Sequence, residues 1–411
     1  MAFVQSPSFQ IIKDWLSATP RDTSIMTVDG LDICVATTQG LKRQTNEDRA
    51  CFARIRSPNT SGSPIYVGIL CDGLGGMQAG AECATIAISS ILSELSALIP
   101  HEVPNSAFLR AIRSANEQIY KQFHGDGGAT LSAFLITTNK CVAVNSGDSR
   151  IYSIGPNGRV VQLSVDDTIA AEVGQVASIS VSRLEQLEFG EQLTQYIGVG
   201  PDLRLQEIDR RIQGQNETIL LLSDGAWRSS NGVLLKVLAH APSPAEIAKR
   251  VLNVSNWCGG VDNTSAVVIP NVSRLLTIKL EDNAKSDDGP QIDIWSAFGR
   301  LSVASEKPLP RYYRLQPPNE SGAPSVFNEQ PFSKTRRRKS LPETKPQGGD
   351  KLPRAKKTTK TEGGKGTTPK QLDIEIVVHE SASTSKNPKP VRGGEMRRDG
   401  DYTVKKVKGS R

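Results

Sequence analysis

Residues 129–163, ATLSAFLITTNKCVAVNSGDSRIYSIGPNGRVVQL, carry the strongest fold signal in the chain. Four apolar runs, at 129–137, 141–145, 150–154 and 159–163, are separated by only three or four turn-forming residues. A parallel return between strands needs about a dozen residues or more, whereas antiparallel neighbours need only a tight turn. The stretch therefore predicts an antiparallel meander of four strands.

The flanking sequence supplies more strands and several long helices. Apolar patterning predicts strands at 31–37, 65–70, 218–222 and 264–269. It predicts helices at 8–16, 78–98, 105–123, 233–239 and 244–254, with Asn105 as an N-cap. Strands and long helices fall into separate blocks, which favours an α+β fold with sheets covered by helices over a doubly wound fold.

Charge divides the 411 residues into two regions. Up to Pro270 there are 21 Lys and Arg against 26 Asp and Glu, a net charge of −5, and the remainder carries +12. After residue 303 Pro, Ser, Thr, Gly and Lys predominate, a composition that cannot bury enough apolar surface to order itself. We expect a lead-in at 1–27, a globular domain at 28–275, a short extension at 276–303 and a basic disordered tail at 304–411.

One segment of the predicted tail, LDIEIVV at 372–378, has strand-like composition. It would add to the edge of a partner's sheet or be an idle apolar patch, and the second interpretation is slightly favoured. The basic clusters of the tail suit weak binding to a protein or a polyanion.

The six cysteines include no Cys-x-x-Cys pair and mostly lie in apolar runs, so we expect reduced, packed thiols. Lys13 and Asp14 interrupt the first apolar stretch, which argues against a secretion signal. No apolar run approaches the roughly 20 residues that span a bilayer. These features predict a cytoplasmic protein without a membrane partner.

Three aspartates stand at the ends of predicted strands or beside glycine: Asp72, Asp224 and Asp262. A single Asp-Gly is usually a turn. A carboxylate emerging from an apolar strand, however, is costly to bury unless a cation or hydrogen bonds meet it. Several such carboxylates together are the oxygen ligands that Mg²⁺ or Mn²⁺ requires.

Six short motifs occur in series along the chain. They are RQTNED (43–48), DGLGG (72–76), GAT (128–130), GDSR (147–150), SDG (223–225) and GGVDN (259–263). In their order and spacing, from about residue 31 to 269, the chain closely resembles the metal-dependent type 2C (PPM) family of Ser/Thr protein phosphatases, in its bacterial form.

The resemblance implies an α+β, four-layer α-β-β-α sandwich with two central antiparallel sheets. It also implies site roles: Asp72 bridges two Mg²⁺ or Mn²⁺ ions, and Arg43 binds the substrate phosphate. The remaining metal-site positions implied by the resemblance are the carbonyl of Gly73, then Asp224, Asp262, Glu47 and Asp48, with Asp148 supporting a third, weaker ion.

The implied reaction is hydrolysis of phosphoserine and phosphothreonine in proteins by a water that bridges the two ions. Substrates would be phosphoproteins made by a Ser/Thr kinase. None of the four histidines lies in a motif, which argues against phosphohistidine chemistry. Cys71 is not followed by an arginine in the Cys-x5-Arg spacing that is typical of a cysteine phosphatase.

The chain departs from the family pattern at several positions. Arg228 stands where the family usually has an aspartate, so two ions are expected rather than three, with Arg228 paired to an acidic neighbour or turned to solvent. Asp166-Asp167-Thr168 replaces an Asp-His-Ser stretch, and Met77 stands where the family often has histidine. The region 169–194, the flap of the family, shows no regular pattern.

Two alternatives remain beside an active phosphatase. The first is a catalytically weak phosphatase-like module that binds or scaffolds phosphoproteins, favoured by Arg228 and the unusual flap. The second is nonspecific, salt-sensitive nucleic-acid binding by the tail as an accessory property. Retention of Asp72, Asp224 and Asp262 together favours the active enzyme.

The tail composition leads to a test. Truncation after residue 304 should leave both kcat for a small phosphoester and the thermal midpoint of unfolding unchanged, because the tail contributes nothing to the core. Loss of the folded domain in a thermal melt of the truncated protein would place the domain boundary further toward the C-terminus.

Overall fold

The computed structural model describes residues 6–304 except 19–21, 29, 57–63, 75–76, 78, 98–102, 139, 178, 188, 211–216, 231, 273–274 and 276–290. The predicted tail, apart from Ala304, and the segment 372–378 lie outside the described residues. The described strands are β1 (Ser24–Val28), β2 (Ile33–Thr38), β3 (Arg49–Arg56), β4 (Ile65–Cys71), β5 (Leu131–Ile136), β6 (Cys141–Ser146), β7 (Arg150–Ile154), β8 (Val160–Gln162), β9 (Gln206–Arg210), β10 (Thr218–Leu222), β11 (Thr264–Ile269), β12 (Gln291–Ser296) and β13 (Gly299–Ala304). The described helices are α1 (Pro7–Leu16), α2 (Gly80–Ser96), α3 (Pro104–Phe123), α4 (Ile169–Ala177), α5 (Val181–Leu184), α6 (Asp224–Trp227), the 3₁₀ turn η2 (Arg228–Ser230), α7 (Val233–Leu238) and α8 (Pro244–Trp257).

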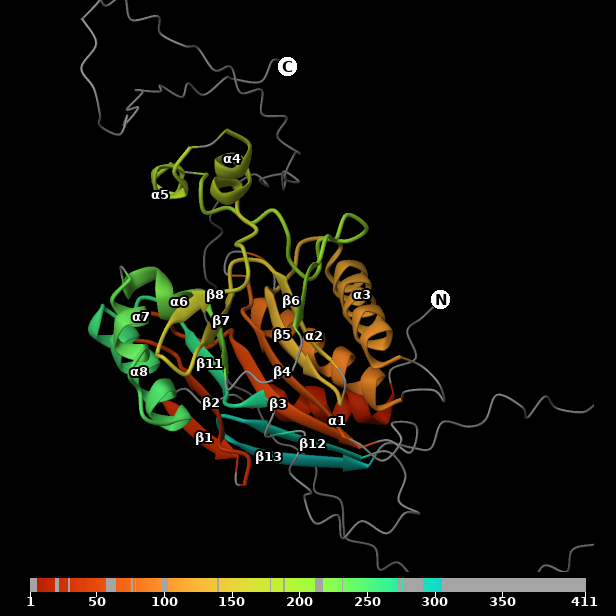
Figure 1. Cartoon of the computed structure of the whole chain (residues 1–411). Helices are drawn as coiled ribbons and strands as arrows, with labels where there is room; N and C mark the ends of the chain where they lie inside the picture. The colour runs from red at the N-terminus through yellow and green to blue at the C-terminus, as the bar shows by residue number, and fades with distance from the viewer. Residues whose placement is uncertain are drawn as a thin grey trace, which may run out of the picture. The chain divides into compact units, whose positions relative to one another are not determined.

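Two antiparallel sheets form the centre of the domain (Figure 1). One has six strands in the order β1-β2-β11-β10-β7-β8, and the other has seven in the order β13-β12-β3-β4-β5-β6-β9. Helices α6, α7 and α8 lie against the first sheet, and α1, α2 and α3 lie against the second (Figure 1). The predicted four-layer α-β-β-α sandwich is confirmed.

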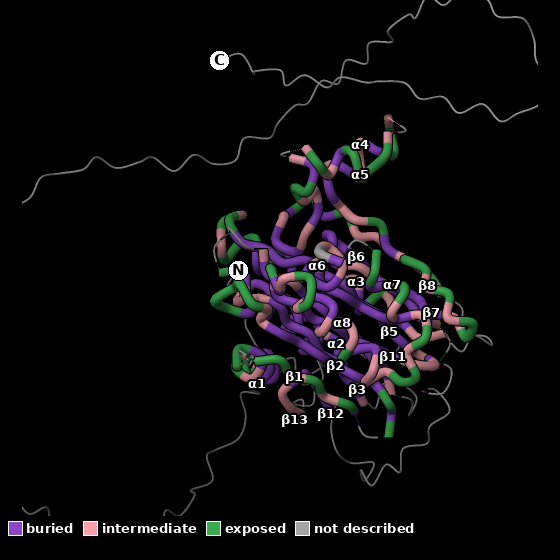
Figure 2. Tube along the Cα trace, turned by 90° about the vertical axis from the view of Figure 1, so that its left-hand side faces the viewer, coloured by how far each residue is buried: buried purple, intermediate pink, exposed green. Residues whose placement is uncertain are grey.

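Three apolar clusters hold the four layers together. The middle one lies between the sheets, where Val35 and Val267 of the six-stranded sheet meet Phe52 and Phe134 of the other. Each outer cluster lies between a sheet and the helices that cover it. In one of them, Val251 of α8 belongs to the same cluster as Cys34 and Ala36 of β2. The tube in Figure 2 is accordingly buried through the strands and exposed mainly at the periphery.

The central strands show little alternation of apolar and polar residues, because both of their faces are buried. In β2, Ile33 and Val35 face the other sheet while Cys34 and Ala36 face the α8 side, and all six residues of the strand are buried. One face of the strand packs between the two sheets. The second face is also covered, because helices pack on the outside of each sheet.

The predicted four-stranded meander is wrong at its centre. β5 pairs with β6, and β7 pairs with β8, but β6 and β7 belong to different sheets. The turn between them includes Gly147 at φ +105°, a conformation that favours glycine. A link of a few residues can join two neighbouring strands of one sheet, but it can also cross from one stacked sheet to the other. The prediction from loop length did not consider the second case.

Two local predictions also need correction. The region 169–194 is not wholly irregular, because α4 and α5 form within it. Helix α3 takes Val103 rather than Asn105 as its N-cap, with Pro104 in the first helical turn. Proline suits that position because its missing N–H would have no helical partner there.

Segments on either side of the predicted globular domain join the sandwich. Helix α1 buries Phe9, Ile12 and Leu16 in the cluster below the seven-stranded sheet. Within the extension predicted at 276–303, β12 pairs with β3, and β13 forms the edge of the same sheet. The ring of Trp15 in α1 lies 4.9 Å from that of Phe298, between β12 and β13.

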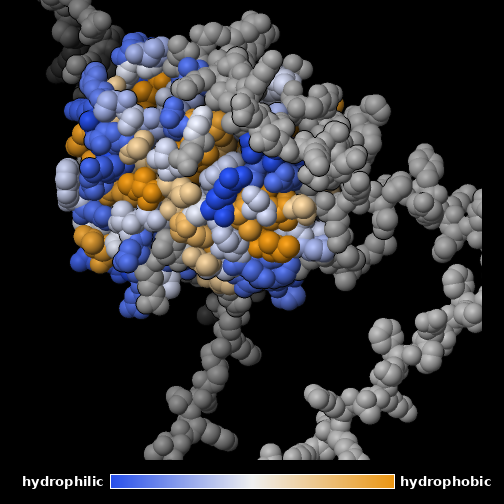
Figure 3. Space-filling view, turned by 90° about the horizontal axis from the view of Figure 1, so that it is seen from below, coloured by the Kyte–Doolittle hydropathy of each residue, from blue (hydrophilic) through white to orange (hydrophobic). Residues whose placement is uncertain are grey.

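The described surface mixes hydrophilic and hydrophobic side chains on the face seen in Figure 3. Within the described ranges, no helix combines the length and apolar character needed to cross a membrane. All six cysteines are free thiols, and all except Cys258 are buried, as predicted for packed reduced thiols.

A buried carboxylate joins three strands of the seven-stranded sheet. Asp293 in β12 is fully buried and accepts bonds from Arg54 (2.7 Å) on β3 and from Arg300 (2.8 Å) and Ser302 (2.6 Å) on β13. Arg56 lies 3.3 Å from the same carboxylate. Burial alone would raise the pKa of Asp293, but the bonds from Arg300, Ser302 and Arg54 lower it to about 2.

Replacement of this carboxylate should destabilise the protein in a pH-dependent way. The folded-state pKa of Asp293 lies below its ordinary value of 3.8, so its contribution is present above pH 4 and is lost as the pH falls toward 2. We expect Asp293→Asn to lower the free energy of unfolding by about 3 kcal/mol at pH 7, and by much less at pH 2. Urea unfolding at both pH values measures the difference.

The control is Asp209→Asn, which removes an exposed ion pair with Lys140 (2.9 Å). Its expected cost is below about 1 kcal/mol. Equal losses in the two variants at pH 7 would contradict a stabilising role for the buried Asp293 cluster.

Candidate active site

Carboxylates from both sheets reach one cavity. Asp72 follows β4 of the seven-stranded sheet, Asp224 opens α6 just after β10, and Asp262 precedes β11 of the six-stranded sheet. The cavity has a volume of about 390 Å³. It is lined by Arg43, Glu47, Asp72, Gly73, Leu74, Thr130, Asp148, Glu191, Leu193, Asp224, Arg228, Asp262 and Asn263.

The backbone of Asp72 is held by the start of β5. Its N–H donates to Oγ1 of Thr130 (3.0 Å), and its carbonyl accepts from the N–H of Thr130 (2.8 Å). The next residue, Gly73, packs so closely on Gly80 at the start of α2 that a Cβ would lie 2.3 Å from the Gly80 carbonyl carbon. Any larger side chain at Gly73 would therefore displace either Asp72 or the helix.

Asp48 lies beneath the cavity rather than on its wall. Its side chain is buried, and Oδ2 accepts a 2.8 Å bond from Ser223. Among the described residues, its Oδ1 is one of the buried side-chain oxygens without a hydrogen-bond partner. Burial raises the pKa of Asp48 to about 7, against the lowering effect of Ser223.

Burial and mutual repulsion also raise the pKa values of three aspartates that line the cavity, Asp72, Asp148 and Asp224. Burial, then the neighbouring Asp48 and Asp224, raise the pKa of Asp72 well above its ordinary value. Burial also raises the pKa of Asp148 to about 7 and that of Asp224, although Arg228 opposes the shift in both. Buried acids that repel one another are stabilised by a positive charge.

The donor chemistry at the cavity fits a hard divalent cation. Carboxylate oxygens dominate its lining, and Asp48, which follows the lining residue Glu47, has a buried Oδ1 without a hydrogen-bond partner among the described residues. In the part of the chain that the structure describes, no three His, Cys, Asp or Glu side chains already stand together as a metal-binding group. Asp262 and Asp224 instead pair with arginines, so an ion would have to draw them away from these partners.

Arg43 lies at the open side of the cavity. One of its terminal nitrogens lies 2.7 Å from Oδ2 of Asp262, and the Arg43 side chain is 43% exposed. The hydrogen bond with Asp262 raises the pKa of Arg43 above its ordinary value, so it stays charged. An exposed guanidinium beside a cavity can bind a phosphate through two parallel hydrogen bonds.

A buried asparagine holds the Arg43 loop against the start of β11. The Nδ2 group of Asn263 donates to the carbonyls of Gln39 and Thr45, both at 2.9 Å, and its Oδ1 accepts from the N–H of Glu47 (2.8 Å). These bonds join the segments that carry Arg43 and Asp262. Asn263 therefore positions both sides of the cavity mouth.

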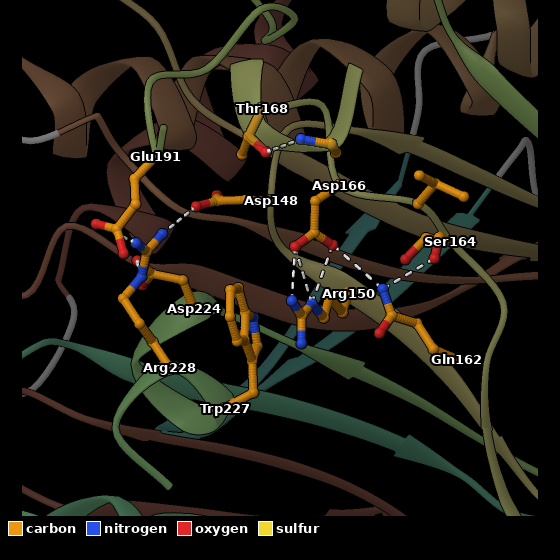
Figure 4. Close-up of polar contacts among 12 residues, drawn as sticks. Asp148, Arg150, Gln162, Ser164, Asp166, Thr168, Glu191, Asp224, Trp227 and Arg228 are labelled. Atoms are coloured by element: carbon orange, nitrogen blue, oxygen red, sulfur yellow. Dashed lines mark hydrogen bonds and ion pairs between the residues drawn. The ribbon is translucent and has the colours of Figure 1, made fainter. Parts of the chain in front are cut away.

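Arg228 lies between three carboxylates (Figure 4). Its Nη2 is 2.6 Å from Asp148, its Nη1 is 2.6 Å from Glu191, and its Nε is 3.1 Å from Asp224. Of the two expected arrangements, pairing with an acidic neighbour or exposure to solvent, the structure shows the first. Its guanidinium already neutralises Asp148, the residue that the family resemblance assigned to a third ion.

The structure brings nearly all the predicted site residues to one place. Those lining the cavity are Arg43, Glu47, Asp72, Gly73, Asp148, Asp224 and Asp262. Asp48 is buried beside them, and the roles of all eight stay predictions. Sequence reasoning missed Asn263 and Thr130, although both stand inside quoted motifs, and missed Glu191, which no local pattern marks.

Comparisons with known proteins address the family. A family model described as Protein phosphatase 2C matches residues 43–256, just over half of the chain. This chain belongs to the protein phosphatase 2C family. The match ends before Asp262, so the place of that residue in the site comes from the tertiary structure.

Individual relatives agree with the family assignment. The serine/threonine phosphatase stp of Listeria welshimeri is 27% identical over 242 residues, covering 57% of this chain and 93% of the relative. The serine/threonine protein phosphatase PstP of Mycobacterium tuberculosis is 25% identical, covering 66% of this chain and 51% of the relative. The predicted enzyme class, a protein phosphatase, is confirmed.

Solved structures show the same fold. The serine/threonine phosphatase of S. agalactiae is 22% identical, covers 58% of this chain and 98% of its own, and superposes with a TM-score of 0.51. Stp1 of Staphylococcus aureus is 19% identical, covers 62% and 98%, and also has a TM-score of 0.51.

The Asn263 contacts of this phosphatase predict a large effect on stability. Asn263→Ala removes three partly buried hydrogen bonds and leaves one N–H and two carbonyls to find new partners, which should cost about 2–4 kcal/mol in the free energy of unfolding. Urea unfolding measures it. The control Asn157→Ala loses one exposed turn bond and should cost less than about 1 kcal/mol.

An Asn263→Ala protein as stable as the control would show that the two loops at the cavity mouth are held by other contacts.

Proposed function

We propose that this protein phosphatase 2C family member hydrolyses phosphoserine and phosphothreonine in proteins with the help of two bound Mg²⁺ or Mn²⁺ ions. Asp72, Asp224 and Asp262 would hold the ions, together with the carbonyl of Gly73 and the acids Glu47 and Asp48. Bound ions would supply an acidified water as nucleophile and positive charge for the phosphoryl oxygens. The substrates would be phosphoproteins made by a Ser/Thr kinase.

The observation that carries this proposal is the meeting of three carboxylates from separate strand ends around one cavity with an arginine at its open side. The three acids lie between 38 and 190 residues apart in the chain, so only the sandwich brings them together. Buried carboxylates with raised pKa values need a positive charge, and divalent ions provide it.

The chain's own groups would bind and orient the substrate. Arg43 is placed to exchange Asp262 for a phosphate, because both its partner and its own side chain are partly exposed. The backbone of Asp72 donates to Oγ1 of Thr130 and accepts from the N–H of Thr130, and these two bonds fix the point from which its carboxylate extends. The apolar side chains of Leu74 and Leu193 line the same cavity and limit the water around the phosphate.

One observation favours a catalytically weak phosphoprotein-binding module as the second candidate. Two of the three predicted metal-ligating aspartates are already paired with arginines, Asp262 with Arg43 and Asp224 with Arg228. If these pairs persist in the presence of ions, the site would bind phosphate without turning it over. Turnover measurements separate the two candidates.

The metal-dependent proposal makes a direct prediction. Hydrolysis of p-nitrophenyl phosphate and of a phosphothreonine peptide should require Mn²⁺ or Mg²⁺, should stop after dialysis against EDTA, and should return when the ion is restored. Asp72→Asn should lower kcat by at least about 100-fold, because it removes charge at the reacting centre.

The control is Asp209→Asn, an exposed acid on β9 that should keep full turnover. Undiminished hydrolysis after EDTA dialysis, or in Asp72→Asn, would exclude this mechanism. Phosphopeptide binding without any turnover in the wild type would instead support the binding module.

A further inference from the structure

Arg228 joins parts of the chain that are otherwise separate. Its three carboxylate partners come from the β6–β7 turn (Asp148), from the start of α6, the helix that directly precedes Arg228 (Asp224), and from the segment that follows α5 (Glu191). Each nitrogen of the guanidinium contacts a different carboxylate (Figure 4). One side chain thus links the cavity wall to a peripheral segment.

That peripheral segment is carried on a narrow neck. Residues 166–170 run beside residues 190–194, with Thr168 opposite Leu193, and the N–H of Ile169 donates to Gln192 (3.0 Å). The N–H of Thr194 donates in turn to Asp167 (2.9 Å). Beyond this neck, α4 and α5 project away from the two sheets (Figure 1).

Each of the two segments of the neck forms an ion pair with an arginine outside it. On one side Asp166 pairs with Arg150 of β7 (2.7 Å), and on the other Glu191 pairs with Arg228 (2.6 Å). The indole of Trp227 stacks against both: Arg150 lies 3.2 Å and Arg228 5.2 Å from its ring centre. Figure 4 shows this arrangement around the indole.

We propose that Arg228 is a positioning residue that latches the neck, through Glu191, to the acidic cavity, and so controls the entry of phosphoprotein substrates. This inference rests on the proposed function for its consequence in catalysis, whereas the latch itself does not. Leu193, two residues after Glu191, lines the cavity, so a shift of the neck changes the cavity wall.

The chemistry of arginine suits this role. Three carboxylates in different directions match the planar fork of a guanidinium, which a lysine ammonium cannot reproduce. Although burial lowers it, Asp224, Asp148 and Glu191 together raise the pKa of Arg228 above its ordinary value. The side chain therefore stays charged, and the latch needs no exchangeable ion.

The latch should discriminate between substrates by size. A small phosphoester needs only the cavity, whereas a phosphorylated segment of a protein must also pass the neck. Loss of the Glu191 contact should therefore raise KM for a phosphopeptide more than KM for p-nitrophenyl phosphate. A purely structural effect would instead change kcat for both substrates together.

The test uses Glu191→Gln in the full-length chain, with Glu172→Gln as the matched control. Glu172 belongs to α4 and pairs with Arg204 (2.8 Å), so the control also removes an ion pair from the projecting segment, but not one that reaches the cavity wall. Hydrogen exchange of the neck amides of Ile169 and Thr194 is the first readout, because it needs no catalysis. The KM values for both substrates are the second.

We expect Glu191→Gln to raise neck exchange and the phosphopeptide KM roughly two- to five-fold, as loss of a partly exposed ion pair allows, and Glu172→Gln to change neither. Arg228→Lys should raise exchange at least as much. Unchanged exchange in a folded Glu191→Gln protein overturns the latch, even if that protein is an active phosphatase. Raised exchange in a protein without any turnover supports the latch while refuting the proposed function.

Discussion

Several carboxylates buried around one cavity must be compensated by positive charge, and much of the architecture follows from this requirement. Asp48, Asp72 and Asp148 all have raised pKa values because burial and mutual repulsion disfavour their charged forms. The chain supplies two arginines at the cavity itself, Arg43 and Arg228. Neither contacts Asp48 or Asp72 by an ion pair in the described structure, and these two acids are the strongest reason to place divalent ions here.

The two packed sheets hold these acids close together despite their mutual repulsion. Asp72 leaves one sheet, whereas Asp224 and Asp262 leave the other, so each acid is anchored by a strand that is buried on both faces. Backbone bonds such as those between Asp72 and Thr130 fix the strand ends without using side-chain carboxylates. The apolar core between the sheets therefore holds together groups that would repel one another in a less rigid framework.

The two arginines compensate charge in different ways. Among the described residues, the Arg43 guanidinium forms an ion pair with Asp262 and is substantially exposed, so it can exchange this partner for an incoming phosphate. Arg228 contacts three acids at once and is less exposed, so its charge is committed to the structure. In this chain a fixed guanidinium thus takes the place beside Asp148 where a mobile cation could otherwise act, and it connects that place to the projecting segment.

Short-range patterns in the sequence were enough to identify most strands and helices, the acids that follow them, and the family. Each of these depends on a few neighbouring residues: apolar spacing, glycine beside a carboxylate, or a motif. The interpretation of the segment at 129–163 failed where the chain crosses from one sheet to the other at Gly147, because a short link has the same appearance in both cases. Extension of the sheet by β12 and β13 was also not predicted, since β12 pairs with β3, which lies more than 200 residues away in the sequence, and β13 joins the sheet only through β12.

By itself, then, the sequence determined the family, the two-sheet α+β class and the identity of the acids. Only the tertiary structure decided which charges meet. Arg43 with Asp262 and Arg228 with Glu191 are contacts between distant segments, and Asn263 holds two loops together through bonds that no motif reveals. The physical reason is that sequence patterns record local backbone preference and burial, whereas ion pairing depends on distances that are set only when the sheets and loops have packed.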